Sequence, residues 1–200
     1  MRFLLVVFSF LFAAPALAHN HFILEAEGGV ATPLGVDAQS EPGGQFGGTF
    51  GFGGRIPGQA PAYYIVGRAG RSGFGFRGPA RYGSAAVELR QTELSAGGRM
   101  YLPITDRLRV SLQLTFGGTY DTAEVDRPGH DRFEYEDSKF TIFTDAGLQY
   151  RVTNNFSFGI GGGLSWLPNR EDADAAAVAA GLDDGPVGRG RLGLTTTFHF

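Results

Sequence analysis

The chain has 200 residues, a formal net charge of −3 at pH 7 and no cysteine. This length is that of a single domain, the small charge gives no reason to expect a nucleic-acid partner, and the lack of thiols excludes disulfides and thiolate metal or redox sites. Glycine supplies 32 residues, and phenylalanine and tyrosine supply 18 and 7. Such a composition favours strands and turns over helices.

The N-terminus has the features of an export signal. Residues 1–18 contain one arginine, an apolar run from Phe3 to Phe12 and the small-residue pattern Ala16-Leu17-Ala18. The run is too short to span a membrane, and the pattern is typical of a secretory signal peptide cleaved after Ala18. We therefore predict a signal peptide at 1–18 and one exported domain at 19–200.

Apolar and polar side chains alternate in eight segments of the remaining chain. The segments lie at about 22–30, 46–55, 62–70, 93–102, 108–120, 140–150, 156–166 and 191–200. Alternation with a period of two predicts strands that have one apolar and one polar face. The clearest case is 108–120, whereas the phase of the third segment, 62–70, is not fixed by its sequence.

Short and long connections take turns between these segments. Turn-forming residues occupy 57–61, 103–106 and 153–155, and long polar stretches occupy about 32–45, 71–84, 121–138 and 167–187. An even number of strands with short links at one end and long links at the other is typical of a barrel that crosses a membrane. The prediction is an all-β fold: an eight-stranded antiparallel up-and-down transmembrane β-barrel.

The signal, the eight alternating strands and the closing LGLTTTFHF resemble the small outer-membrane β-barrel proteins of Gram-negative bacteria, which include the OmpA barrel domain and OmpX. The resemblance implies periplasmic turns, extracellular loops and a location in the outer membrane. In that family the barrel assembly machinery recognises a terminal Phe preceded by alternating apolar residues. It thus implies this role for Leu192, Leu194, Phe198 and Phe200.

A secreted barrel with its apolar face inward around a ligand, as in lipocalins, is the alternative architecture. It would place the charged face of every strand outside. It would also give no reason for the apolar C-terminus or for the alternation of short turns with long loops. We therefore favour the transmembrane barrel.

The inward positions of the predicted barrel combine many glycines with long charged side chains. The charged residues expected in the lumen are Glu25, Glu27, Arg68, Glu93, Arg99, Arg109, Asp145, Arg151 and Arg191. Because an unpaired charge inside a narrow barrel is costly, we expect these groups to pair and to plug the lumen. The alternative is a narrow, porin-like path for ions or water that these pairs gate.

The predicted loops differ in charge. The basic segment 68–83 has interleaved aromatic residues, and its Arg71, Arg77 and Arg81 suit contact with the phosphates of lipopolysaccharide. The alternative is an ordinary solvated loop. Acidic segments at 121–138 and 169–185 match no defined calcium-binding spacing, so we predict no metal and no cofactor.

A lipid A hydrolase is the enzymatic alternative, because some eight-stranded outer-membrane barrels deacylate lipid A. Such chemistry needs a Ser beside a His and an acid, and none of the four histidines has a Ser neighbour on a lipid-facing strand. We predict no catalytic residues. The expected role is structural display at the envelope surface, as a monomer whose partners are membrane lipids, lipopolysaccharide and, during biogenesis, the assembly machinery.

Overall fold

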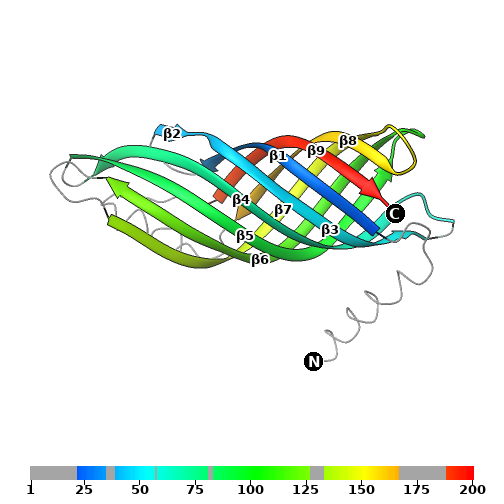
Figure 1. Ribbon diagram of the computed structural model, residues 1–200, viewed down its shortest axis with the longest axis horizontal. Coiled ribbons are helices and arrows are strands. Elements are labelled where there is room, and N and C mark those ends of the chain that lie inside the picture. The colour runs from blue at the N-terminus through cyan, green and yellow to red at the C-terminus, as the bar shows by residue number, and fades with distance from the viewer. Residues whose placement is uncertain (1–21, 35–38, 57, 81–82, 127–132, 167–187) are drawn as a thin grey trace, which may run out of the picture.

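The computed structural model describes residues 22–34, 39–56, 58–80, 83–126, 133–166 and 188–200, which form an all-β barrel (Figure 1). The predicted signal peptide lies outside these residues. The strands are β1 (Phe22–Leu34), β2 (Gln39–Glu41), β3 (Gly43–Arg55), β4 (Ala62–Ala80), β5 (Gly83–Pro103), β6 (Leu108–Asp126), β7 (Phe133–Arg151), β8 (Phe156–Trp166) and β9 (Gly188–His199).

Hydrogen bonds close the sheet on itself. The strand order is β2-β4-β3-β1-β9-β8-β7-β6-β5, and β5 also pairs with β4. Strands β2 and β3 both pair with β4 and are separated only by Pro42, which has no N–H to donate. Together they therefore count as one of the eight strands of the barrel. All pairings are antiparallel, which confirms the predicted eight-stranded barrel.

Pairing of the first strand with the last holds the apolar C-terminus in place. Phe22 and Phe200 each donate a backbone hydrogen bond to the other, at 3.3 and 3.0 Å. The three short turns lie where they were predicted. In the first, Gln59 N donates to Ile56 O and Gly58 adopts φ +80°, a conformation that favours glycine.

The prediction of long loops at 71–84 and 121–138 is wrong for the described residues. Strand β4 continues to Ala80 and β5 starts at Gly83, while β6 continues to Asp126 and β7 starts at Phe133. The likewise predicted loop at 32–45 contains the end of β1, all of β2 and the start of β3, and 167–187 lies outside the described residues. Beyond a bilayer the outer face of a strand is free to be polar, so alternation fades although pairing continues.

The outer face of the barrel is apolar, and the inner face is polar. Side chains exposed on the outside include Leu24, Phe50, Leu112, Leu148, Ile160 and Leu194. The phase of the third strand is now fixed, because Arg68 points inward while Tyr63 and Ile65 point outward. Among the described residues no helix is long and apolar enough to cross a membrane.

Two apolar layers bound the polar lumen. At the turn end Ile23, Tyr64, Val66 and Tyr101 pack together as a buried cluster. At the loop end Phe74, Val87, Leu89, Ala123 and Val125 are buried on paired positions of β4, β5 and β6. Burying an apolar side chain of this kind stabilises the fold by about 1.5–3 kcal/mol. The buried ion pairs of Glu25 and Glu93 thus lie between these two layers.

Candidate functional site in the barrel lumen

The lower tier of the lumen centres on one ion pair. Arg99 Nη2 lies 2.7 Å from Glu25 Oε1, and Arg99 Nε donates to Gln113 Oε1 at 2.7 Å. The other oxygen of Glu25 accepts from Gln149 Nε2 at 2.8 Å and from Thr197 Oγ1 at 2.7 Å. Both charges are buried. Charge-assisted hydrogen bonds with several partners compensate the loss of hydration of such a pair.

The upper tier holds three arginines and three carboxylates. Its members are Arg68, Arg189, Arg191, Glu27, Glu93 and Asp145. Glu93 is central, because it pairs with all three arginines, including Arg191 Nη1 at 3.1 Å. Arg68 also pairs with Glu27, and Arg191 also pairs with Asp145. Equal numbers of the two charges make this buried tier neutral.

Glycines in the wall make room for these side chains. A Cβ atom on Gly163 would lie 1.9 Å from Asp145 Oδ1 and 2.9 Å from Arg191 Nε, and one on Gly70 would lie 3.0 Å from Glu93 Oε1. The cavity left between the tiers is about 30 Å³, room for about two water molecules. Paired side chains therefore close the lumen at this level.

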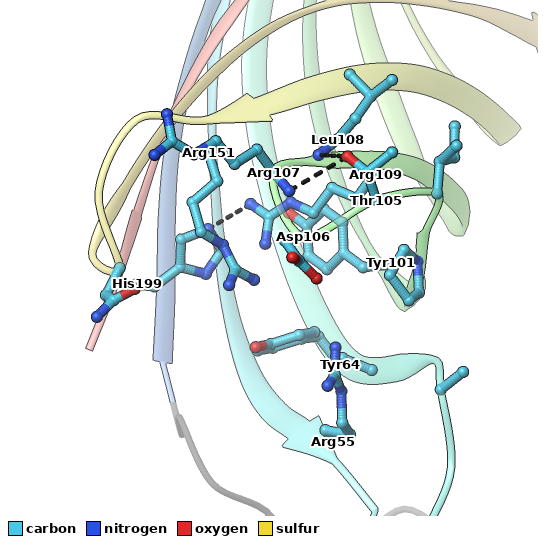
Figure 2. Close-up of a pocket in the computed structure, with 15 residues that line it drawn as sticks. Arg55, Tyr64, Tyr101, Thr105, Asp106, Arg107, Leu108, Arg109, Arg151 and His199 are labelled. Atoms are coloured by element: carbon cyan, nitrogen blue, oxygen red, sulfur yellow. Dashed lines mark hydrogen bonds between the residues drawn. The ribbon is translucent and has the colours of Figure 1, made fainter.

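A larger cavity of about 780 Å³ lies at the turn end, and we call it the vestibule (Figure 2). Four arginines line it from four different elements: Arg55 at the end of β3, Arg107 in the β5–β6 turn, Arg109 on β6 and Arg151 at the end of β7. Asp106 is the carboxylate residue among the lining side chains. A hydrogen bond to the Tyr150 hydroxyl raises the pKa of Arg107 above its ordinary value.

Arg109 forms the floor of the vestibule. Its guanidinium lies 4.1 Å from the centre of the Tyr101 ring, and it donates to Gln149 Oε1 at 2.7 Å and Ser157 Oγ at 3.1 Å. It also donates to His199 Nε2, the contact drawn as a dashed line in Figure 2. All of these partners are uncharged side chains or an aromatic face, apart from the titratable His199.

The structure thus brings eight of the nine predicted lumen residues into two tiers or the vestibule floor. The ninth, Arg151, is half-buried and lines the vestibule. Sequence reasoning missed Arg189, although it lies two residues before Arg191 in the same phase. It also missed Gln113, Gln149 and Thr197, because uncharged polar residues on a predicted inner face carry no signal of their own.

The matching family model decides the classification. The model of the outer membrane protein beta-barrel domain matches residues 3–183 of the chain. The chain belongs to this family. It is therefore an integral protein of the outer membrane, and its exposed apolar belt contacts lipid.

Solved structures give the same fold. Neisserial surface protein A is 15% identical, with a TM-score of 0.51 over 90% of this chain and 97% of that one. The attachment invasion locus protein Ail of Yersinia pestis is 17% identical, with a TM-score of 0.54 over 91% of this chain and 100% of that one. A comparison with curated protein sequences finds no match.

Aromatic side chains mark both edges of the lipid-facing belt of this outer-membrane barrel. Phe22, Phe156 and Phe198 lie at the turn end, where Phe156 and Phe198 contact each other at 5.2 Å. Tyr120 and Trp166 are exposed toward the loop end. Leu192, Leu194, Phe198 and Phe200, the residues predicted to form the assembly signal, are all exposed on the outer face of β9 and its end.

The predicted lipopolysaccharide contacts lie on a strand. Arg71 and Arg77 are exposed on the outer face of β4, and Arg81 lies outside the described residues. Arg71 is paired with Thr92 of β5, which is paired with Tyr120 of β6. Arg71 therefore lies in the same pairing row as Tyr120, near the aromatic edge of the belt, where lipid headgroups lie.

Among the described residues, one Ser–His contact is present, and it lies in the lumen. Ser157 Oγ is 3.5 Å from His199 Nε2, and both side chains are buried at the turn end. The neighbour of this imidazole is the Arg109 guanidinium, whereas hydrolytic triads place a carboxylate there. Within the described part of the chain, no cluster of three or more His, Asp or Glu residues could hold a metal ion.

Proposed function

We propose that this protein is a non-enzymatic barrel that displays an extended sheet at the cell surface and contacts lipopolysaccharide there. The observation that carries the proposal is the unequal length of the strands. Strands β4 to β7 have 19 to 21 residues, whereas β8 has 11 and β9 has 12. A tilted strand crosses a bilayer with about 9–11 residues. The four long strands therefore continue well beyond the lipid.

Figure 1 shows these four strands projecting past β8 and β9 at the end opposite the C-terminus. The eight residues that β6 has beyond the length of β8 correspond to about 20 Å along the barrel axis. Pairing of β4 with β5 continues to Ala80 and Gly83. A paired sheet of this height is a rigid platform, which suits the presentation of a surface to a partner.

The lipopolysaccharide contact is supported by two arginines on the outer face. Arg71 lies at headgroup level, and Arg90 on β5 is paired with Gly73, two positions further along β4. Both side chains are exposed. Diagonal neighbours on one face of a sheet are about 7–8 Å apart. Two guanidiniums at this spacing suit one phosphate group, because arginine forks bind phosphate oxygens in pairs.

The test measures binding of purified lipopolysaccharide to the barrel in detergent micelles. We expect the double variant Arg71→Gln/Arg90→Gln to bind at least tenfold more weakly than the wild type. The control is Glu134→Gln, an exposed charged residue of β7 outside both proposed anion sites, and it should not weaken binding. Equal affinity of the double variant and the wild type would rule out this contact.

The alternative function is a narrow pore, and the two charged tiers argue against it. Ions could pass only if the pair of Arg99 with Glu25 and the contacts of Glu93 separated. We therefore expect no steady single-channel current from the wild type in planar bilayers. A steady current that Arg99→Ala or Glu25→Ala changes would establish the pore and overturn the closed lumen.

The non-enzymatic role has its own test. Because the Ser157–His199 contact is enclosed by the barrel wall, an acyl chain in the bilayer has no access to it. Incubation with lipid A should release no fatty acid. Acyl release that Ser157→Ala abolishes would overturn this part of the proposal.

Two steps of biogenesis complete the proposal. Cleavage after Ala18 would start the mature chain at His19, which mass spectrometry of the protein purified from outer membranes would test. Recognition of the outward side chains of β9 by the assembly machinery would make Phe200→Ala accumulate outside the membrane. Heat-modifiable migration on gels detects folded barrels and measures the assembled fraction of Phe200→Ala. An assembled fraction equal to that of the wild type would contradict recognition of Phe200 by the machinery.

A further inference from the structure

The vestibule has a charge imbalance that the tiers above it lack. Four arginines and one aspartate line it, whereas the upper tier has three of each sign. Among the described residues none of the four vestibule arginines forms an ion pair with a carboxylate. Like charges gathered around one cavity repel one another and attract an anion from solution.

The excess of positive charge is energetically unfavourable because Arg109, one of the four arginines, is buried. Its side chain is only 8% exposed. The other buried arginines, Arg68, Arg99, Arg189 and Arg191, each pair with at least one carboxylate. Arg109 instead contacts Gln149, Ser157, His199 and the Tyr101 ring. A buried charge is normally paired, and among the described residues no carboxylate contacts the Arg109 guanidinium directly.

We propose that the vestibule is a binding site for a multiply charged oxyanion of the periplasm, a small molecule that carries phosphate or carboxylate groups. The cavity of about 780 Å³ is within the range of small-molecule sites. Guanidinium groups bind both kinds of oxyanion through paired hydrogen bonds. Tyr64 and Tyr101, which meet edge to face at 5.6 Å, provide an aromatic wall for the body of the ligand.

The exposure of the four arginines indicates which of them an entering anion contacts first. Arg55 and Arg107 are exposed and lie at the rim, Arg151 is half-buried, and Arg109 is the floor. The rim residues come from the end of β3 and from the β5–β6 turn, so their side chains are not needed to close the barrel. They are suited to capture an anion that then neutralises Arg109.

The test is calorimetric titration of the folded barrel in detergent micelles with two probes, inorganic pyrophosphate and citrate. We expect saturable binding of at least one probe at low salt, and a lower affinity at high salt because of screening. The two probes distinguish phosphate from carboxylate chemistry. Arg55→Gln, Arg107→Gln and Arg151→Gln should each weaken binding about tenfold, because each removes one charge-assisted contact to the anion.

The control is Glu134→Gln, an exposed charged residue of β7 at the opposite end of the barrel that belongs to neither proposed anion site, and it should bind like the wild type. Heat-modifiable migration shows that each variant is folded, and the exposed position of Arg55 and Arg107 keeps at least two variants informative. Absence of saturable binding of either probe would overturn the proposal. The proposal would also be overturned if all three vestibule variants bound the probe as tightly as the wild type. The same holds if the control variant lost as much affinity as they do.

Discussion

Glu93 is the residue on which the upper tier depends most. It is 2% exposed and is the shared partner of three guanidiniums. The change Glu93→Gln keeps the shape of the side chain and removes its charge, so three buried arginines would face the two carboxylates of Glu27 and Asp145. Breaking a buried ion pair from one side costs about 3–5 kcal/mol. We expect a loss of this size in the free energy of unfolding.

Unfolding can be measured through the fluorescence of Trp166. It is the single tryptophan of the chain and lies exposed on the outer face at the loop end. Its fluorescence should follow urea-induced unfolding from lipid vesicles. The matched control is Glu134→Gln, an exposed glutamate of β7, which should shift stability by no more than about 0.5 kcal/mol.

A second variant separates charge imbalance from lost packing. Combining Glu93→Gln with Arg189→Gln returns the tier to two charges of each sign. The double variant should therefore be less destabilised than the sum of the two single variants, by about 0.5–3 kcal/mol. If Glu93→Gln were as stable as the Glu134→Gln control, the lumen would be hydrated and the reasoning about buried pairs would be refuted.

Three further changes test the wall, the core and the lipid-facing surface. Gly163→Ala should destabilise the barrel in the same unfolding assay, because its Cβ would push Asp145 from Arg191, whereas Gly67→Ala has open space and should not. Phe143→Ala removes a fully buried ring that lies against the Arg191 guanidinium and should cost about 3–5 kcal/mol. Leu112→Arg on the lipid face should cost about 2–4 kcal/mol in vesicles if it lies near the midplane, and no loss would contradict the membrane assignment.

Alternation predicted which side chains share a face, and in 108–120 it did so residue by residue. It could not predict the pairing partners. Glu25 and Arg99 are 74 positions apart, and they meet across the lumen because β1 and β5 lie three strands apart around one closed cylinder. Closure and register are properties of the whole sheet. A local pattern therefore predicts which face of a strand a side chain lies on but not which side chain it contacts across the lumen.

The loop ends show a second limit of local patterns. Polar and glycine-rich residues of 71–84 and 121–138 indicated loops because alternation was the criterion for a strand. In the structure Glu88, Glu124 and Glu134 occupy one row across β5, β6 and β7. An outer face that touches water needs no apolar residues, so the sequence could not distinguish a solvated strand from a loop.

The net charge of the whole chain conceals how charge varies along the barrel. The upper tier is balanced, the row of three glutamates lies at the loop end, and four arginines line the vestibule at the turn end. Because the tiers close the lumen, the vestibule is a blind pocket. An anion that enters it from the periplasm would bind and leave by the same opening. Binding there and conduction through the barrel are therefore separable, and Arg55→Gln should weaken binding without producing a current.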